Sequence, residues 1–184
     1  HSEFGFRRPV ARESGRLNIV WEGLPVTLSG VAPVLPALRE LAKETELRLH
    51  LVTDLSGPMY MNRFLTRDTE DLVADWGIDV RLHEWTKANL LRVAEIADVA
   101  IVPVDLSDPM AVGKPENRLR IFWRLGLPVL VSNTPSHVRA TRLAGIGDRV
   151  VCSTPEDWEA ALRDLCSSSE RRLEVARAGQ AIAE

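Results

Sequence analysis

Three polar residues surround the expected start of one helix. Lys114 lies in a loop, and Asn117 and Arg118 fall in the first turn of a helix predicted over residues 116–125. The helix macrodipole disfavours cations at this end by about a few tenths of a kcal/mol each. Backbone N–H groups at a helix start also bind anions. The placement is easier to understand with a bound anion such as a diphosphate, although a solvated loop with local ion pairs would also account for it.

Other candidate residues follow expected strands. Glu22 could accept hydrogen bonds from sugar or ribose hydroxyls, and Trp85 could stack on a nucleobase, although a Trp in this position is more often part of the core. Ser132 offers a hydroxyl to a sugar or phosphate, and it could equally serve a turn. His137 lies at a loop edge and is a weaker candidate for chemistry. No residue is assigned a catalytic role.

The elements that must position these residues alternate regularly along the chain. Hydrophobic periodicity and the placement of Pro, Gly and N-cap residues separate strands from helices. Gly77, Gly126 and Gly145 each follow an expected helix and predict its end. Strands are expected over residues 17–21, 47–53, 78–85, 98–104, 128–131 and 149–153. Helices are expected over residues 33–44, 66–76, 86–97, 116–125, 136–144, 155–166 and 170–184, with loops over 22–30, 57–61 and 105–116.

Strands that alternate with helices need crossover connections, so the sheet must be mainly parallel and covered on both faces. The sequence predicts an α/β fold: a doubly wound, mainly parallel six-stranded Rossmann-like sheet of strand order 3-2-1-4-5-6. Ligands bind such sheets beyond the carboxyl ends of the strands, where the strand order reverses. The candidate residues all lie at or near those strand ends.

Composition limits the function classes. The 184 residues carry a net charge of −3, which argues against nucleic acid as the main partner. Two cysteines are too few for a disulfide framework, and no apolar run reaches the length of a membrane span, so we expect a cytoplasmic protein. Residues 1–16 are interpreted as a cloning scar and linker, and residues 17–184 as one domain of a longer protein. No Cys/His spacing or Asp-x-Asp motif suggests a metal site, so no cofactor or metal is expected.

The segment KPENRLRIFWRLGLPVLVS (residues 114–132) resembles the donor-sugar half of GT-B glycosyltransferases of the family-4 type. Residues 117–119 fall on the family's Asn/Ser-Lys-Leu, and residues 126–129 fall on its Gly-x-Pro-Val. Residues 97–99 resemble the Ala-Asp-Val that precedes the fourth strand. Gly23 matches the glycine that lets a donor diphosphate approach the first strand. The resemblance covers about residues 17–184.

This resemblance implies a hexosyltransferase-like enzyme of bacterial polysaccharide or glycoconjugate synthesis. This domain would bind the nucleotide-sugar, and a separate N-terminal domain would bind the acceptor. The full-length protein would be cytoplasmic, with peripheral attachment to the inner membrane left open. The implied substrate-binding residues are Glu22, Gly23, Trp85, Lys114, Asn117, Arg118 and Ser132.

The sequence also departs from the family pattern. Two acidic positions of the family hold Ile121 and Gly113 here, and no basic residue lies between Arg16 and Arg39, where the family usually carries a diphosphate clamp. Two alternatives therefore stay open: a non-catalytic Rossmann-like interaction or nucleotide-binding module, and a sugar-nucleotide epimerase-like domain.

Overall fold

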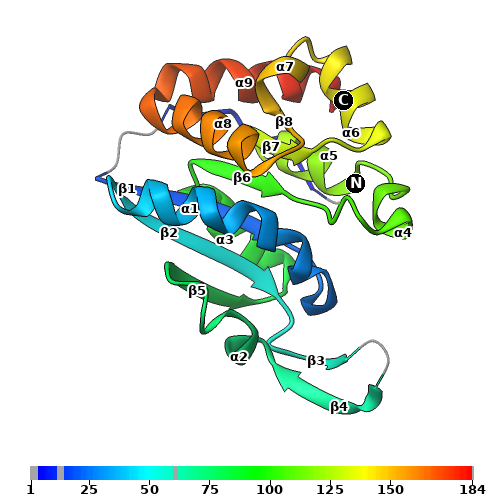
Figure 1. Ribbon diagram of the computed structural model, residues 1–184. Coiled ribbons are helices and arrows are strands. Elements are labelled where there is room, and N and C mark those ends of the chain that lie inside the picture. The colour runs from blue at the N-terminus through cyan, green and yellow to red at the C-terminus, as the bar shows by residue number, and fades with distance from the viewer. Residues whose placement is uncertain (1–3, 12–14, 60–61, 184) are drawn as a thin grey trace.

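The computed structural model describes residues 4–11, 15–59 and 62–183. It contains one six-stranded parallel sheet with helices on both faces (Figure 1). Residues 1–3 and 12–14 of the expected scar and linker, residues 60 and 61 of an expected loop, and residue 184 of the last expected helix lie outside the described ranges. Within those ranges no helix has the length and apolar character needed to cross a membrane.

The sheet has the strand order β5-β2-β1-β6-β7-β8, and every pairing is parallel. In sequence order of the six strands this is 3-2-1-4-5-6, so the prediction of a doubly wound sheet is confirmed. The order reverses between β1 and β6. The strands are β1 (Arg16–Glu22), β2 (Glu46–Thr53), β5 (Asp79–Glu84), β6 (Val99–Val102), β7 (Val129–Ser132) and β8 (Val151–Cys152).

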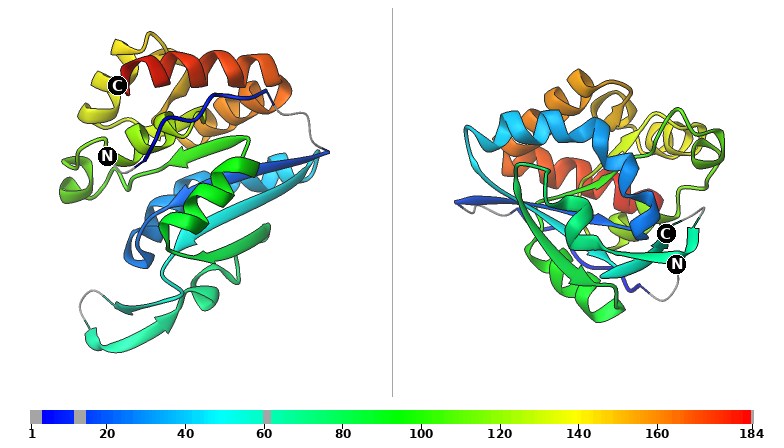
Figure 2. Two further views of the ribbon diagram at one scale, coloured as in Figure 1. Left: turned by 180° about the vertical axis from the view of Figure 1, so that it is seen from behind. Right: turned by 60° about the horizontal axis from the view of Figure 1, so that its bottom comes forward.

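Helices α1 and α8 pack together on one face of the sheet, and α3, α5 and α9 cover the other (Figures 1 and 2). The first loop contains a 3₁₀ helix, η1, where a loop was predicted. The helical elements are η1 (Pro25–Val34), α1 (Leu35–Ala42), α2 (Thr69–Val73), α3 (Lys87–Ile96), α4 (Pro109–Val112), α5 (Asn117–Arg124), α6 (Pro135–Leu143), α7 (Gly147–Val150), α8 (Pro155–Ser167) and α9 (Ser169–Ile182).

Local signals in the sequence explain several helix ends. Gly77, Gly126 and Gly145 adopt φ values of 66°, 76° and 70°, which side chains with a Cβ rarely tolerate. Gly126 and Gly145 directly follow the C-caps of α5 and α6, so these two predicted helix stops are confirmed. Gly77 lies four positions beyond Val73, where α2 ends, so it does not stop that helix as predicted. Helix α8 begins with a capping box, in which the side chains of Thr154 and Asp157 bond to each other's backbone N–H groups.

The expected elements are wrong in two regions. A hairpin of β3 (Ser56–Met59) and β4 (Asn62–Asp68) replaces the loop expected over residues 57–61 and the first part of the helix expected over residues 66–76. It projects from the body of the domain (Figure 1). Thr69 closes the base of the hairpin, since its hydroxyl donates to the Asp54 carbonyl at 2.6 Å and its N–H to the Leu55 carbonyl at 2.8 Å. The helix can therefore begin only at Thr69.

The second error concerns the last strand, which was expected over residues 149–153. Residues 147–150 form a helical turn, α7, and only two residues pair with β7. The Arg149 side chain explains part of this difference. Its guanidinium pairs with Glu174 of α9 at 2.9 Å and with Asp164 of α8 at 3.7 Å, which holds this segment against the two helices.

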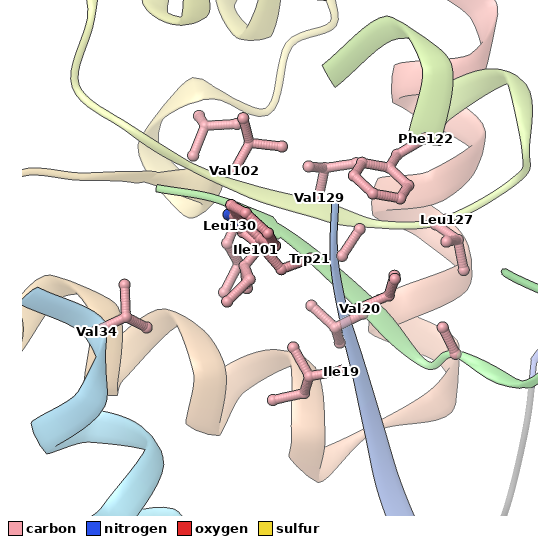
Figure 3. Packing of buried hydrophobic residues seen from close by; sticks show 14 of the residues in the cluster. Ile19, Val20, Trp21, Val34, Ile101, Val102, Phe122, Leu127, Val129 and Leu130 are labelled. Atoms are coloured by element: carbon pink, nitrogen blue, oxygen red, sulfur yellow. The ribbon is translucent and has the colours of Figure 1, made fainter. Parts of the chain in front are cut away.

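The core lies on both faces of β1, β6 and β7. Trp21 and Ile101 are at most 1% exposed, and Phe122 of α5 packs onto the same cluster (Figure 3). β6 and β7 are buried at all four positions, as expected for central parallel strands covered on both faces. This rigid centre fixes the strand ends at which the candidate residues lie.

Residues 4–11 lie along the α5–α9 side of the domain (Figure 2). The Arg7 N–H donates to the Arg124 carbonyl at 2.8 Å, and Gln180 Nε2 donates to the Arg7 carbonyl at 2.7 Å. Arg124 Nε donates to the Phe4 carbonyl at 2.8 Å. This segment therefore joins the two helices; its origin as a cloning scar and linker stays a prediction.

A pair of histidines connects β2 and β5. His50 is 3% exposed, and its Nε2 lies 3.2 Å from Asn18 Oδ1, which can only accept a hydrogen bond. Nε2 must therefore donate, and in neutral His50 Nδ1 accepts from His83 Nε2 at 2.9 Å. While His83 keeps its proton on Nε2, protonation of His50 Nδ1 would set two N–H groups against each other. Burial, followed by the nearby charges of His83 and Arg48, lowers the pKa of His50 to about 4.

We expect this histidine pair to make the fold sensitive to acid. The folded pKa lies below the ordinary value of 6.5, so the stabilising contribution is complete above pH 6.5 and is lost as pH falls towards 4. Between pH 7.5 and 5 the free energy of unfolding should fall by about 1–2 kcal/mol. Urea unfolding should show that the free energy of unfolding of His50→Gln depends less on pH than that of the parent domain. The other buried histidine, His137, is present in both proteins and serves as a common background. The same pH dependence in both proteins would contradict the role given to His50.

Candidate functional site

The candidate residues gather at the carboxyl edge of the sheet. β1 ends at Glu22 and β6 at Val102, the two strands between which the strand order reverses. The loop after β6 leads through α4 to the start of α5, and β7 ends at Ser132. This is the place where open α/β sheets bind ligands.

Glu22 links two of the other candidates. Trp85 Nε1 donates to Glu22 Oε1 at 2.8 Å, and Arg118 Nε lies 3.5 Å from Glu22 Oε2. The three residues come from the end of β1, the end of β5 and the first turn of α5. Trp85 is 45% exposed, so its ring faces solvent rather than the core. Its stacking on a nucleobase stays a prediction.

Arg118 is held at the start of α5 by two neighbours. Besides Glu22, the Trp21 ring lies below its guanidinium, with 6.0 Å between Arg118 Cζ and the ring centroid. Its side chain keeps 31% of its surface exposed. The group is therefore positioned and still accessible to an anion, because only one of its donor groups faces the carboxylate.

Gly23 is required by packing. A Cβ at this position would lie 2.7 Å and 2.8 Å from two ring atoms of Trp21 and 2.9 Å from Thr27 Oγ1. Those distances are too short for any side chain unless the buried indole moves. The packing therefore explains the glycine without a ligand, and its approach to a diphosphate stays a prediction.

Lys114 and Asn117 are exposed beside the start of α5. Among the described residues Lys114 forms no ion pair, although its carbonyl accepts a hydrogen bond from Ser136 Oγ at 2.8 Å. That bond fixes the loop against the start of α6. The helix α5 thus presents Lys114 and Arg118 near its N-terminus, as the sequence predicted.

Glu116 is the buried acid of this region and was not among the predicted site residues. It accepts hydrogen bonds from Arg120 Nη2 at 3.2 Å and from Arg139 Nη2 at 3.1 Å. Burial raises the pKa of Glu116, but its backbone N–H and the two arginines outweigh that effect and lower it. Arg120 follows Glu116 by four residues and could have been found from helical spacing; Arg139 could not.

The hydroxyl of Ser132 already bonds to the backbone of Val104. Its Oγ accepts from the Val104 N–H at 2.8 Å and donates to the Val104 carbonyl at 3.2 Å, and the residue is 3% exposed. The hydroxyl thus joins the end of β7 to the segment that follows β6. Its contact with a sugar or phosphate stays a prediction, and a ligand would have to displace these bonds.

His137 lies buried in the first turn of α6. The carbonyl of Ser132 can only accept, so His137 Nδ1 donates to it at 2.9 Å. In the neutral ring Nε2 is then the acceptor. Burial is the main cause that lowers the pKa of His137, which favours this neutral form. The residue could therefore accept a proton or a hydrogen bond close to Glu116 and Arg118, whose charges act on it.

Over the described part of the chain, no three His, Cys, Asp or Glu side chains come together in a way that could hold a metal ion. The expected absence of a metal cofactor stays a prediction. The polar groups described above are arginines, a lysine, two carboxylates paired with arginines, and a neutral histidine. The loop after β6 adds Asp105, which bonds to Ser107, and Asp108, which accepts from the Met110 N–H. Within this mixed set, Lys114 and Arg118 are suited to binding an anion and stabilising negative charge.

No protein-family model and no curated protein matches this sequence. Several solved structures share its fold at low identity. WaaG, a glycosyltransferase involved in lipopolysaccharide biosynthesis, is 17% identical with a TM-score of 0.64, over 93% of this chain and 43% of that one. A glycosyltransferase from Rickettsia africae is 16% identical with a TM-score of 0.65, over 93% and 43%.

The catalytic domain of cholesterol-α-glucosyltransferase from Helicobacter pylori is 15% identical with a TM-score of 0.57, over 91% of this chain and 96% of that one. The present chain spans less than half the length of the first two structures. At these identities the likeness extends to the fold. The chain therefore has the Rossmann-like α/β fold that these glycosyltransferases contain.

Proposed function

We propose that this domain binds the nucleotide-sugar donor of a GT-B glycosyltransferase of the family-4 type, as its C-terminal domain. One observation carries the proposal: Arg118 and Lys114 stand at the N-terminus of α5, at the switch in strand order. Two cations beside the N-terminus of this eight-residue helix together favour a diphosphate. The shared fold with glycosyltransferases supports this interpretation.

The chemistry follows from the charges. When a sugar leaves its nucleotide, negative charge grows on the departing diphosphate. Lys114 and Arg118, with the positive end of α5, would stabilise that charge without a metal ion. The acceptor, a polysaccharide or glycoconjugate, would be bound by a second domain, since WaaG and the Rickettsia africae glycosyltransferase are more than twice as long as this chain. Alone, this domain would bind donor and transfer nothing.

A second candidate function is a non-catalytic module of the same fold. It is favoured by the sequence of the first loop, which has no basic residue between Arg16 and Arg39, and by Glu22 at the site itself. Ile121, which replaces the family's acidic residue, packs against the core and offers no polar group for a ribose.

Titration with UDP, GDP, ADP and CMP separates the two candidates. We expect at least one of them to raise the melting temperature, since a ligand at 100 times its Kd stabilises a domain by about 2.7 kcal/mol. The shift should persist in EDTA because no metal takes part in the proposed binding. Absence of any shift at millimolar nucleotide would favour the non-catalytic module, and a loss on chelation would refute the metal-free site.

A further inference from the structure

Glu22 is an acid placed inside a site proposed to bind an anion. Its side chain is only 15% exposed, and both of its oxygens are engaged: Oε1 by Trp85 Nε1 at 2.8 Å, and Oε2 by Arg118 Nε at 3.5 Å. No other charged residue lies between Glu22 and Arg39, so no neighbour in that loop offsets its charge. The carboxylate is therefore a fixed negative charge at the end of β1.

Glu22 and the phosphate of a bound ligand would therefore compete for the guanidinium of Arg118. Glu22 attracts Arg118 as an ion pair at 3.5 Å, and a ligand phosphate would attract the same guanidinium with charge-assisted hydrogen bonds. Trp85 holds the other oxygen of Glu22 by a hydrogen bond of 2.8 Å, which opposes a swing of the carboxylate into solvent when a ligand arrives. The ligand must either share Arg118 with the carboxylate or draw the guanidinium away from it, and in both cases two negative charges come close together.

We propose that Glu22 is a specificity-determining residue of this site, which competes for Arg118 and disfavours ligands of high negative charge. The inference rests on the donor-binding function proposed above. Repulsion from a fixed carboxylate grows with ligand charge. Glu22 therefore weakens a nucleoside diphosphate more than a monophosphate.

The test is the substitution Glu22→Gln. The amide oxygen can still accept the hydrogen bond from Trp85 Nε1, while the competing charge is removed. The probes are UDP, UMP and inorganic pyrophosphate, the last to make the result independent of the base. We expect the affinity for UDP and pyrophosphate to rise about five- to tenfold and that for UMP to rise less. The UDP gain should shrink as salt concentration increases.

Glu46→Gln is the matched control. Glu46 also pairs with an arginine, Arg16, but it lies at the start of β2, at the opposite edge of the sheet. The substitution Glu46→Gln makes the same change in net charge as Glu22→Gln. It should leave the affinities for UDP, UMP and pyrophosphate unchanged. Melting temperatures of both variants without ligand show whether either substitution affects folding.

The outcomes separate this inference from the proposed function. If the unsubstituted domain binds UDP or pyrophosphate and Glu22→Gln binds no tighter, Glu22 does not compete, and a weaker affinity would make it a direct ligand contact instead. Equal gains for UDP and UMP would also overturn the charge argument. If neither protein binds any probe, the donor-binding function fails and the inference fails with it. Binding by Glu22→Gln alone would support competition by Glu22 and would count against donor binding by the unsubstituted domain.

Discussion

Substitution of Gly179 by valine is expected to destabilise the domain by about 3 kcal/mol. Gly179 lies in α9 directly against the indole of Trp123, a residue of α5 that is fully buried. A Cβ at this position would lie 2.3 Å from Trp123 Nε1 and 2.5 Å from two further ring atoms. The indole has no room to move, so α9 would have to separate from α5.

The size of this effect can be measured in steps. Gly179→Ala should cost less than valine, because alanine favours a helix by about 1 kcal/mol over glycine and offsets part of the clash. Ala181→Val is the control: it places the same β-branched side chain in α9 at an exposed position. We expect the valine at position 179 to lower the melting temperature by roughly 6–12 °C. Similar losses in both valine variants would contradict the packing argument.

A double substitution identifies the contact itself. Trp123→Leu shortens the side chain that Gly179 faces, and should reduce the penalty of Gly179→Ala. The two changes should therefore cost less together than the sum of their separate costs, with a coupling of at least about 1 kcal/mol. Additive costs would mean that the two helices can move apart without strain.

The fold could be predicted because its signals are local. Helix ends were marked by glycines such as Gly126, which needs a positive φ, and the start of α8 by Thr154 and Pro155. Uninterrupted apolar runs such as residues 99–102 gave the central strands. The handedness of crossover connections then left few strand orders to consider.

The hairpin of β3 and β4 could not be predicted in this way. The two strands can pair because Thr69, at the end of the hairpin, bonds to the carbonyls of residues 54 and 55, which directly follow β2. Fifteen residues separate Thr69 from Asp54, and no periodicity in between records that contact. A turn-rich segment with a short helical pattern behind it favours a loop and a helix when it is considered alone.

The positions of the site residues could be predicted from their types and from their places at the ends of strands. The hydrogen bonds and ion pairs among them could not. Glu22 and Trp85 are 63 positions apart and share a hydrogen bond. Glu116 and Arg139 are 23 apart and form an ion pair across two helices. Residues so far apart in the sequence come into contact only in the folded domain, so the sequence alone does not indicate these pairs. This also explains why Ser132, a plausible ligand contact in the sequence, has its hydroxyl bonded to Val104.

Arg118→Ala is expected to weaken nucleotide binding about tenfold or more. Hydrogen bonds from a guanidinium to a phosphate contribute about 1.5–3 kcal/mol, and a tenfold change in Kd corresponds to about 1.4 kcal/mol. The substitution also leaves the Glu22 carboxylate without its cation, which makes the site more repulsive to an anion. Stability should change little, because the ion pair is partly exposed and such pairs contribute at most about 1 kcal/mol.

The control for Arg118 is Arg171→Ala. Arg171 also lies in the first turn of a helix, α9, and pairs with an acid, Asp164, so it matches Arg118 in charge and in position on its helix. Its removal should leave the affinity unchanged. Arg118→Lys keeps the charge but loses the planar set of donors, and should fall between the two. Isothermal titration of the three variants with the nucleotide that binds the parent domain best provides the measurement. Equal affinity in Arg118→Ala and the parent would mean that the phosphates lie elsewhere than at the start of α5.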